Sequence, residues 1–258
     1  MDICAHRLRP SPRDIGNTKD GLVALYELGV KHVEADVVDI ASGEEIIYHP
    51  GTTEDDLTFM TWPEIRRTGL KVMSLEEYFC LLKSYRMTCY LELKQNSEQL
   101  VEDVVAAIIE HGLQNNIFVT AFQKKINWPL FVTESEGQRL LDAKALNPNI
   151  KTHLIAGEPW KLPELVQEFH SDMVSFGWIQ KPWAMGVITK ALFKFLTRKT
   201  DMREQVRKVQ GMGIKVMAGI VNDVESMHEF AELGIDMIMT DDVVLGMKFK
   251  EEYEKSPA

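Results

Sequence analysis

Two acidic residues inside an apolar run give the first chemical signal in this sequence. Residues 33–38 read Val-Glu-Ala-Asp-Val-Val, an alternation typical of a strand. Glu34 and Asp36 would point the same way, because side chains two residues apart share one face of a strand. Paired carboxylates are costly in a packed core unless a cation lies between them. With His49 thirteen residues after Asp36, the pattern predicts a divalent-metal site beside a proton-transfer group.

Two further strand-like runs end in residues of the same chemical kind. The expected strand 2–5 is followed by His6 and Arg7, and Glu92 and Lys94 alternate with leucines. Charged residues rarely interrupt such runs without a structural or chemical reason, and a structural ion pair is the alternative for any single pair. Three coincidences at matching strand ends favour one common site.

The residue types indicate which reaction such a site could catalyse. Glu34, Asp36 and Glu92 are hard oxygen ligands suited to one divalent cation, Mg²⁺ or Ca²⁺, rather than zinc. Arg7 and Lys94 could contact phosphoryl oxygens. The histidines His6 and His49 are candidates for the acid and base of a displacement at phosphorus. Together these groups suit metal-dependent cleavage of a phosphodiester.

The elements that must carry these residues alternate between short apolar runs and longer amphipathic segments. Such alternation favours an α/β fold, a (β/α)8 TIM barrel, whose active site lies at the carboxyl ends of the strands. No glycine-rich phosphate loop follows any strand, which counts against an open sheet. We expect a single domain over 1–258, with a short, polar, irregular insertion at about 50–73. The expected strands cover 2–5, 32–38, 87–94, 117–122, 150–155, 172–176, 214–218 and 235–239. A long helical pattern covers 187–210.

Composition limits the classes of partner. A formal net charge of −10 argues against nucleic acid, and no apolar run is long enough for a membrane span. Neither a signal peptide nor metal-spaced cysteines are apparent, so we expect a reduced, cytoplasmic protein whose three thiols are buried. Segment 187–207 mixes apolar and basic residues, typical of a barrel helix, a homo-oligomer contact or a membrane-surface helix.

In combination, these motifs are similar to those of a known family. The chain resembles the glycerophosphodiester phosphodiesterases, a TIM-barrel family within the phosphatidylinositol-phospholipase-C-like group. The matching positions are Ala5-His6-Arg7, Asn17-Thr18, Glu34-x-Asp36-Val37, Gly43, His49, Glu92-x-Lys94, Val221-Asn222-Asp223, Gly234-Ile235-Asp236 and Thr240-Asp241. The resemblance spans about residues 3–242.

The resemblance implies a role for each matching residue. It implies metal ligation by Glu34, Asp36 and Glu92, acid/base catalysis by His6 and His49, and phosphate contacts from the two basic residues Arg7 and Lys94. The implied reaction is hydrolysis of a small-molecule phosphodiester to an alcohol and a phosphomonoester. A cyclic phosphate intermediate would form where a neighbouring hydroxyl attacks first.

Four positions depart from the family pattern. Leu8 stands for glycine, Gly16 for glutamate, Pro50 for aspartate and Gly219 for a tryptophan of the glycerol pocket. The cluster Phe176, Trp178 and Trp183 would be core packing or a substrate wall in place of that tryptophan. Two alternatives therefore stay open, a lyase that forms cyclic phosphates from lysolipids and a barrel that binds phosphorylated ligands without turnover.

Overall fold

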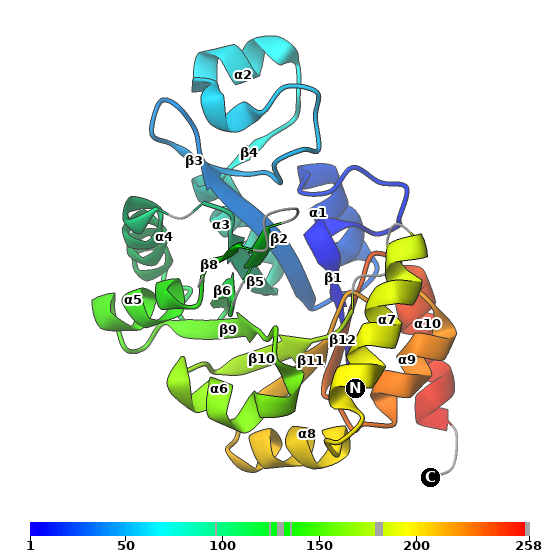
Figure 1. Ribbon diagram of the computed structural model, residues 1–258. Coiled ribbons are helices and arrows are strands. Elements are labelled where there is room, and N and C mark those ends of the chain that lie inside the picture. Colours follow the sequence, from blue (N-terminus) through cyan, green and yellow to red (C-terminus); the bar gives the residue numbers. More distant parts are fainter. Residues whose placement is uncertain (96, 124, 128–131, 135, 179–182, 256–258) are drawn as a thin grey trace.

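Eight parallel strands close into a barrel with helices around it (Figure 1). The computed structural model describes residues 1–95, 97–123, 125–127, 132–134, 136–178 and 183–255, with no side-chain description for 125–127, 132–134 and 183–185. The barrel strands, in spatial order, are β1 (Asp2–Ala5), β2 (His32–Asp39), β5 (Thr88–Leu93), β6 (Ile117–Phe122), β9 (Lys151–Ile155), β10 (Met173–Phe176), β11 (Lys215–Ala218) and β12 (Met237–Thr240). β1 pairs with both β12 and β2, which closes the ring. The expected (β/α)8 barrel is confirmed.

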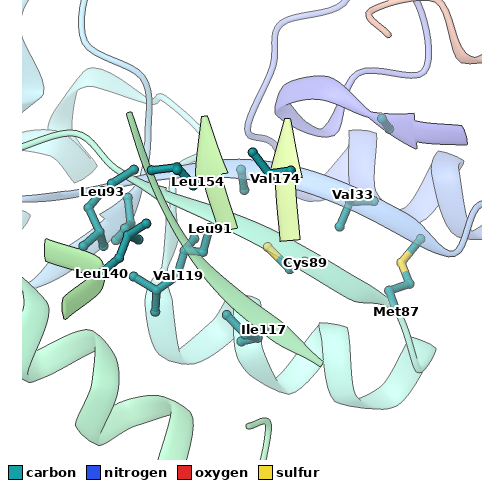
Figure 2. Close-up of a cluster of buried hydrophobic side chains, with 14 of the residues drawn as sticks. Val33, Met87, Cys89, Leu91, Leu93, Ile117, Val119, Leu140, Leu154 and Val174 are labelled. Atoms are coloured by element: carbon teal, nitrogen blue, oxygen red, sulfur yellow. The ribbon is translucent and has the colours of Figure 1, made fainter. Parts of the chain in front are cut away.

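Alternation along the strands separates two sets of side chains. On β5, Cys89, Leu91 and Leu93 join the large apolar cluster between the barrel and its helices, part of which Figure 2 shows. Tyr90 instead packs inside the barrel with methionines of β10, β11 and β12. Glu92 has the same parity as Tyr90, so the strand period directs its carboxylate to the interior.

The helices cover the barrel in chain order. They are α1 (Lys19–Glu27), α3 (Leu75–Tyr85), α4 (Glu98–Glu110), α5 (Gln138–Leu146), α6 (Leu162–Glu168), α7 (Trp183–Thr197), α8 (Met202–Gly211), α9 (Val224–Ala231) and α10 (Val243–Lys255). The helical pattern expected over 187–210 is thus two helices. Asp201 explains the interruption, because its carboxylate accepts a hydrogen bond from the backbone N–H of Glu204 and caps α8. No helix in the described part of the chain has the length and apolarity to cross a bilayer.

The insertion after β2 is more regular than expected. It contains β3 (Glu45–Ile47), the 3₁₀ turn η2 (Leu57–Phe59), α2 (Trp62–Thr68) and β4 (Met73–Ser74), and it lies at the top of the view in Figure 1. β3 pairs antiparallel with β2 and β4. Thr61 and Glu64 form a capping box at the start of α2, and Gly69, with φ 76°, ends it. The Trp62-Pro63 pair therefore begins a helix, since proline is well tolerated in a first turn.

Candidate active site

The structure brings the sequence-predicted residues to one end of the barrel. His6 and Arg7 follow β1 in the short turn η1 (His6–Leu8), and His49 follows β3. Asp36 of β2 lies directly opposite Glu92 of β5 in the parallel register. Because both side chains stand on the interior face, the pairing of β2 with β5 is what assembles the acidic pair.

Three carboxylates form the centre of the site. Oxygen atoms of Glu34, Asp36 and Glu92 all lie within 4.8 Å of one another, and all three side chains are buried. Lys94 donates a hydrogen bond to Glu92 Oε1 at 2.5 Å, and its Nζ lies 2.9 Å from Asp36 Oδ1. Glu34 Oε2 accepts from the backbone N–H of Arg7 at 2.8 Å, whereas Glu34 Oε1 is buried with no hydrogen-bond partner.

The electrostatics of this cluster differ from one carboxyl group to the next. Burial raises the pKa of Glu34 well above its ordinary value, and the neighbouring Asp36 and Glu92 raise it further. Burial also raises the pKa of Glu92. For Asp36, burial is outweighed by Lys94 and Arg7, and the pKa falls. Three carboxyl groups thus share two cations, and an added cation would favour the ionised form of Glu34.

Arg7 and Asn17 border the three carboxylates, and both contact Asp36. Arg7 has φ 52°, which is unusual for a residue with a side chain. Its Nε lies 3.5 Å from Asp36 Oδ2, and the same oxygen accepts from Asn17 Nδ2 at 2.8 Å. The Asn17 backbone N–H donates to the Arg7 carbonyl at 2.6 Å. The two residues therefore fix each other and Asp36 at once.

His6 is oriented by a residue from the opposite end of the chain. Its Nδ1 lies 2.8 Å from Asp241 Oδ1, and its Nε2 lies 3.8 Å from Glu34 Oε2. An ionised carboxylate only accepts hydrogen bonds, so Nδ1 carries the ring proton and Nε2 is the free nitrogen of the neutral ring. Burial lowers the pKa of His6, and the bond to Asp241 opposes that shift.

His49 lies at the edge of the cluster, half-buried. Burial lowers the pKa of His49 to about 4, with Asp36 raising it and Lys94 and Arg7 lowering it. Its ring is thus neutral near pH 7 in the substrate-free protein. Because Asp36, Lys94 and Arg7 all affect the pKa of His49, His49 lies close enough to them to belong to the same site.

Residues with no role predicted from the sequence complete the site. Asp241 accepts from Asn222 Nδ2 at 2.9 Å, and Arg9 NH1 lies 3.4 Å from Asp241 Oδ1. Asn17 contacts Asp36, as described above. The sequence could have indicated three of these four residues. Asn17, Asn222 and Asp241 belong to the family motifs Asn17-Thr18, Val221-Asn222 and Thr240-Asp241. Arg9 had no such signal.

The departures from the family pattern have structural consequences. A Cβ at Gly16 would lie 2.8 Å from the Arg7 carbonyl oxygen and 2.9 Å from Arg7 Cβ, so this backbone has no space for the glutamate of the pattern. Phe176 and Trp178 are buried and stack with Phe193 and Phe230, which supports the core-packing interpretation for these two. The Trp183 side chain lies outside the described residues.

The expectation that all three thiols are buried was wrong. Cys4 and Cys89 are buried, but Cys80 is exposed. It lies on α3 near His111, whose Nε2 is 2.7 Å from Glu76 Oε2. His153 is fully buried in the barrel.

Comparisons with known proteins agree on the family. The chain matches the sequence model of the Glycerophosphoryl diester phosphodiesterase family over residues 8–245. That range includes both acidic strands, His49 and Lys94. A comparison with curated proteins found no match.

Solved structures of the same family share the fold. A glycerophosphodiester phosphodiesterase from Parabacteroides distasonis has a TM-score of 0.71 at 18% identity, over 97% of this chain and 95% of that one. The enzyme from Thermotoga maritima has a TM-score of 0.69 at 17% identity, with 95% and 96% covered. An Oleispira antarctica phosphodiesterase, in complex with the product sn-glycerol-3-phosphate, has a TM-score of 0.66 at 22% identity, with 94% and 93% covered. The chain belongs to the glycerophosphoryl diester phosphodiesterase family, whose members are phosphodiester hydrolases.

Proposed function

We propose that this enzyme hydrolyses a glycerophosphodiester to an alcohol and a phosphomonoester, with one divalent cation and the pair His6 and His49. The observation that carries the proposal is the buried triad of Glu34, Asp36 and Glu92, whose oxygen atoms lie within 4.8 Å of one another. Such a triad supplies the acidic ligands of a hard cation. The other groups around it match the remaining needs of the reaction.

The donor set fits Mg²⁺ or Ca²⁺. The unpartnered, buried Glu34 Oε1 is an acceptor with no donor among the described residues, and a cation would satisfy it. All three ligands are carboxylates, which suit hard cations rather than zinc. When bound, the cation would withdraw charge from a phosphoryl oxygen and ease attack at phosphorus. Coordination by oxygen alone leaves the choice between the two ions to experiment.

Arg7 and Lys94 would bind and orient the phosphodiester. Both cations border the carboxylates, with Arg7 Nε 3.5 Å from Asp36 and Lys94 bonded to Glu92. Opposing carboxylates raise the pKa of Lys94 despite its burial, so it keeps its charge at neutral pH. A charged amine and a guanidinium offer the donors that a phosphoryl group needs.

His6 and His49 would divide the two proton transfers. The low pKa of His49, about 4, leaves its ring neutral and able to take the proton of the attacking hydroxyl. His6 Nε2 carries no proton in the neutral ring, so His6 would first take one from water; Asp241 would stabilise the resulting charged ring through Nδ1, and Nε2 would then give that proton to the leaving alcohol. The attacking hydroxyl is that of water or of a neighbouring alcohol on the substrate. In the second case a cyclic phosphate forms first.

The test compares His6→Ala and His49→Ala with the unaltered enzyme on glycerophosphocholine and bis(p-nitrophenyl) phosphate, with and without Mg²⁺ or Ca²⁺. Each variant should lose turnover while its circular dichroism and thermal transition stay close to normal; substantial residual activity would sink the acid/base assignment. Phosphorus NMR of the products separates the alternatives. A phosphomonoester supports a hydrolase, a cyclic phosphate as the final product supports the lyase, and no turnover on any diester supports a binding barrel.

The expected homo-oligomer contact and the expected cellular location remain predictions. α7 exposes Ile188, Leu192 and Phe195, so the homo-oligomer contact expected from segment 187–207 is open to a sedimentation measurement. The cytoplasmic location is likewise a prediction, to be checked by cell fractionation.

A further inference from the structure

A groove lies beside the active site, between the first loop with α1 and the insertion. Its volume is about 590 Å³, within the size range of small-molecule sites. Most of its lining surface is apolar, and apolar side chains from both sides contribute to it, among them Ile15, Ala24, Ile47, Leu70 and Val72. Ile15 is 69% exposed and Leu70 is 40% exposed. These two side chains offer apolar surface that an occupant would remove from water.

The groove is continuous with the catalytic cluster. His49 and Asn17 line it, and Asn17 also donates its side-chain hydrogen bond to Asp36 Oδ2. Gly16 lies on the same wall and contributes no side chain. A substrate whose phosphate reached His49 would therefore have one of its two alcohols at the mouth of this groove.

Each charged residue that lines the groove has a polar partner within the protein, and the Lys71–Asp20 pair is mostly exposed to water. Lys71 on the insertion lies 3.1 Å from Asp20 on α1, and Lys19 lies 2.8 Å from Glu77. Asp14 accepts from the backbone N–H of Ser11. A polar or charged alcohol would need uncommitted donors or acceptors to replace its water. The lining instead matches an apolar chain.

We propose that this groove binds a linear alkyl or acyl chain on one alcohol of the phosphodiester, so that the preferred substrate is a single-chain amphiphile. The proposal rests on the proposed function, since it needs the reacting phosphate at His49. It differs from that function in naming the chemistry of the alcohol. A glycerol or choline group without a chain would leave Ile15 and Leu70 exposed and gain little from the groove.

The test is the dependence of kcat/KM on chain length. Substrates are glycerophosphocholine and its 1-acyl derivatives with chains of four to twelve carbons, all below their micelle-forming concentrations. Each methylene that is fully buried adds about 0.8 kcal/mol, or about fourfold. We expect kcat/KM to rise by up to about fourfold per methylene and to level off when the groove is full.

Leu70→Asp and Ala24→Trp should flatten this rise, the first by charge and the second by filling the groove. Ile109→Asp is the matched control, because Ile109 on α4 is 41% exposed, like Leu70, but lies outside the groove. It should keep the full dependence on chain length. Having two groove variants keeps the test decisive if one of them folds poorly.

The outcomes separate the two proposals. Flat chain-length dependence in an enzyme that cleaves bis(p-nitrophenyl) phosphate would overturn the groove and leave the phosphodiesterase intact. A steep dependence that survives in both groove variants would also overturn it, because the chain would bind elsewhere. Absence of turnover on every diester would overturn the proposed function itself.

Discussion

His6 and Asp241, separated by 235 positions in the sequence, are joined by a hydrogen bond of 2.8 Å between Nδ1 and Oδ1. His6 follows β1 and Asp241 follows β12, the two strands whose pairing closes the barrel. The pairing of β1 with β12, which closes the barrel, therefore also brings Asp241 next to the proposed acid His6. Asn222 supports the arrangement by donating to Asp241 Oδ2 and accepting from the Asp241 backbone N–H.

Asp241→Asn should lower kcat by roughly 10²- to 10⁴-fold, the usual range for proton-transfer groups. An asparagine does not stabilise a protonated ring and can favour the wrong tautomer. The kcat–pH profile should change as well. The limb on which activity falls as His6 loses its proton should move to lower pH. A merely structural role for Asp241 would lower activity without moving that limb.

Asp236→Asn is the matched control for this prediction. Asp236 accepts from the Val216 backbone N–H and from Gln210 at the opposite end of β12. Its loss should cost about 1–3 kcal/mol of stability and leave kcat unchanged. Equal losses of kcat in the two variants would contradict a specific role for Asp241.

The meeting of the candidate residues at one end of the barrel was largely predictable from the sequence, because strands and helices alternate regularly along the chain. A two-residue period set Glu34, Asp36 and Glu92 on interior faces, and strand ends are where barrel sites form. The long-range contact between His6 and Asp241 was not readable, because no local pattern encodes which strand ends meet. The resemblance marked Thr240-Asp241 as a motif but assigned it no role.

Some local details could not be predicted from the sequence, because a single side chain can override a general pattern. The helical pattern of 187–210 continues through the interruption before α8, and the single carboxylate of Asp201 is enough to start a new helix. In the insertion, α2 is seven residues long, too short for a clear apolar period. The exposure of Cys80 follows from its position on the outer face of α3, which composition alone does not reveal.

Glu34→Gln should abolish stabilisation of the protein by Mg²⁺ or Ca²⁺. A cation that binds only the folded state adds about 2.7 kcal/mol at a hundred times its Kd, or roughly 5–10 °C in Tm for a chain of this size. The variant removes one proposed ligand and also the buried carboxylate whose pKa is most raised. Its Tm without metal should therefore be unchanged or slightly higher.

Differential scanning calorimetry with and without each cation measures this difference, and Glu44→Gln, at an exposed turn, serves as the control. The control should keep the full shift. An undiminished metal-induced shift in Glu34→Gln would exclude Glu34 as a ligand. The cation with the larger shift in the unaltered enzyme also identifies the better fit.

Gly16→Ala should disturb the contacts of Arg7 and Asn17 with Asp36. The added Cβ would meet the Arg7 carbonyl oxygen at 2.8 Å, so the loop must shift, at a cost of about 1–3 kcal/mol. Because the Arg7 side chain would move with the loop, KM for the phosphodiester should rise. Gly211→Ala, with nothing within 4 Å of its Cβ at the end of α8, should be neutral or slightly stabilising. Similar effects of the two substitutions on KM would rule out this role for the Gly16 position.

The acid sensitivity of the fold should depend on His153. Burial lowers the pKa of His153 from 6.5 to about 3, so the folded protein keeps this ring neutral where the unfolded chain protonates it. Above pH 6.5 both states are neutral and the residue has no pH effect. As the pH falls from 6.5 towards 3, protonation of the unfolded chain removes stability, by about 2 kcal/mol at pH 5.

Urea unfolding of the unaltered enzyme and of His153→Gln between pH 7.5 and 4.5 tests this directly. The variant loses some stability at every pH, but its free energy of unfolding should fall less steeply below pH 6.5, because glutamine does not titrate. Thr120→Val is the control, since Thr120 Oγ1 lies 3.2 Å from His153 Nδ1 and its loss breaks the same contact while the ring remains. That variant should keep the steep fall. Parallel pH dependences in the unaltered enzyme and His153→Gln would show that the ring is protonated equally in the folded and unfolded states, and would assign the acid sensitivity to other groups such as His6 and His32, whose pKa values burial also lowers.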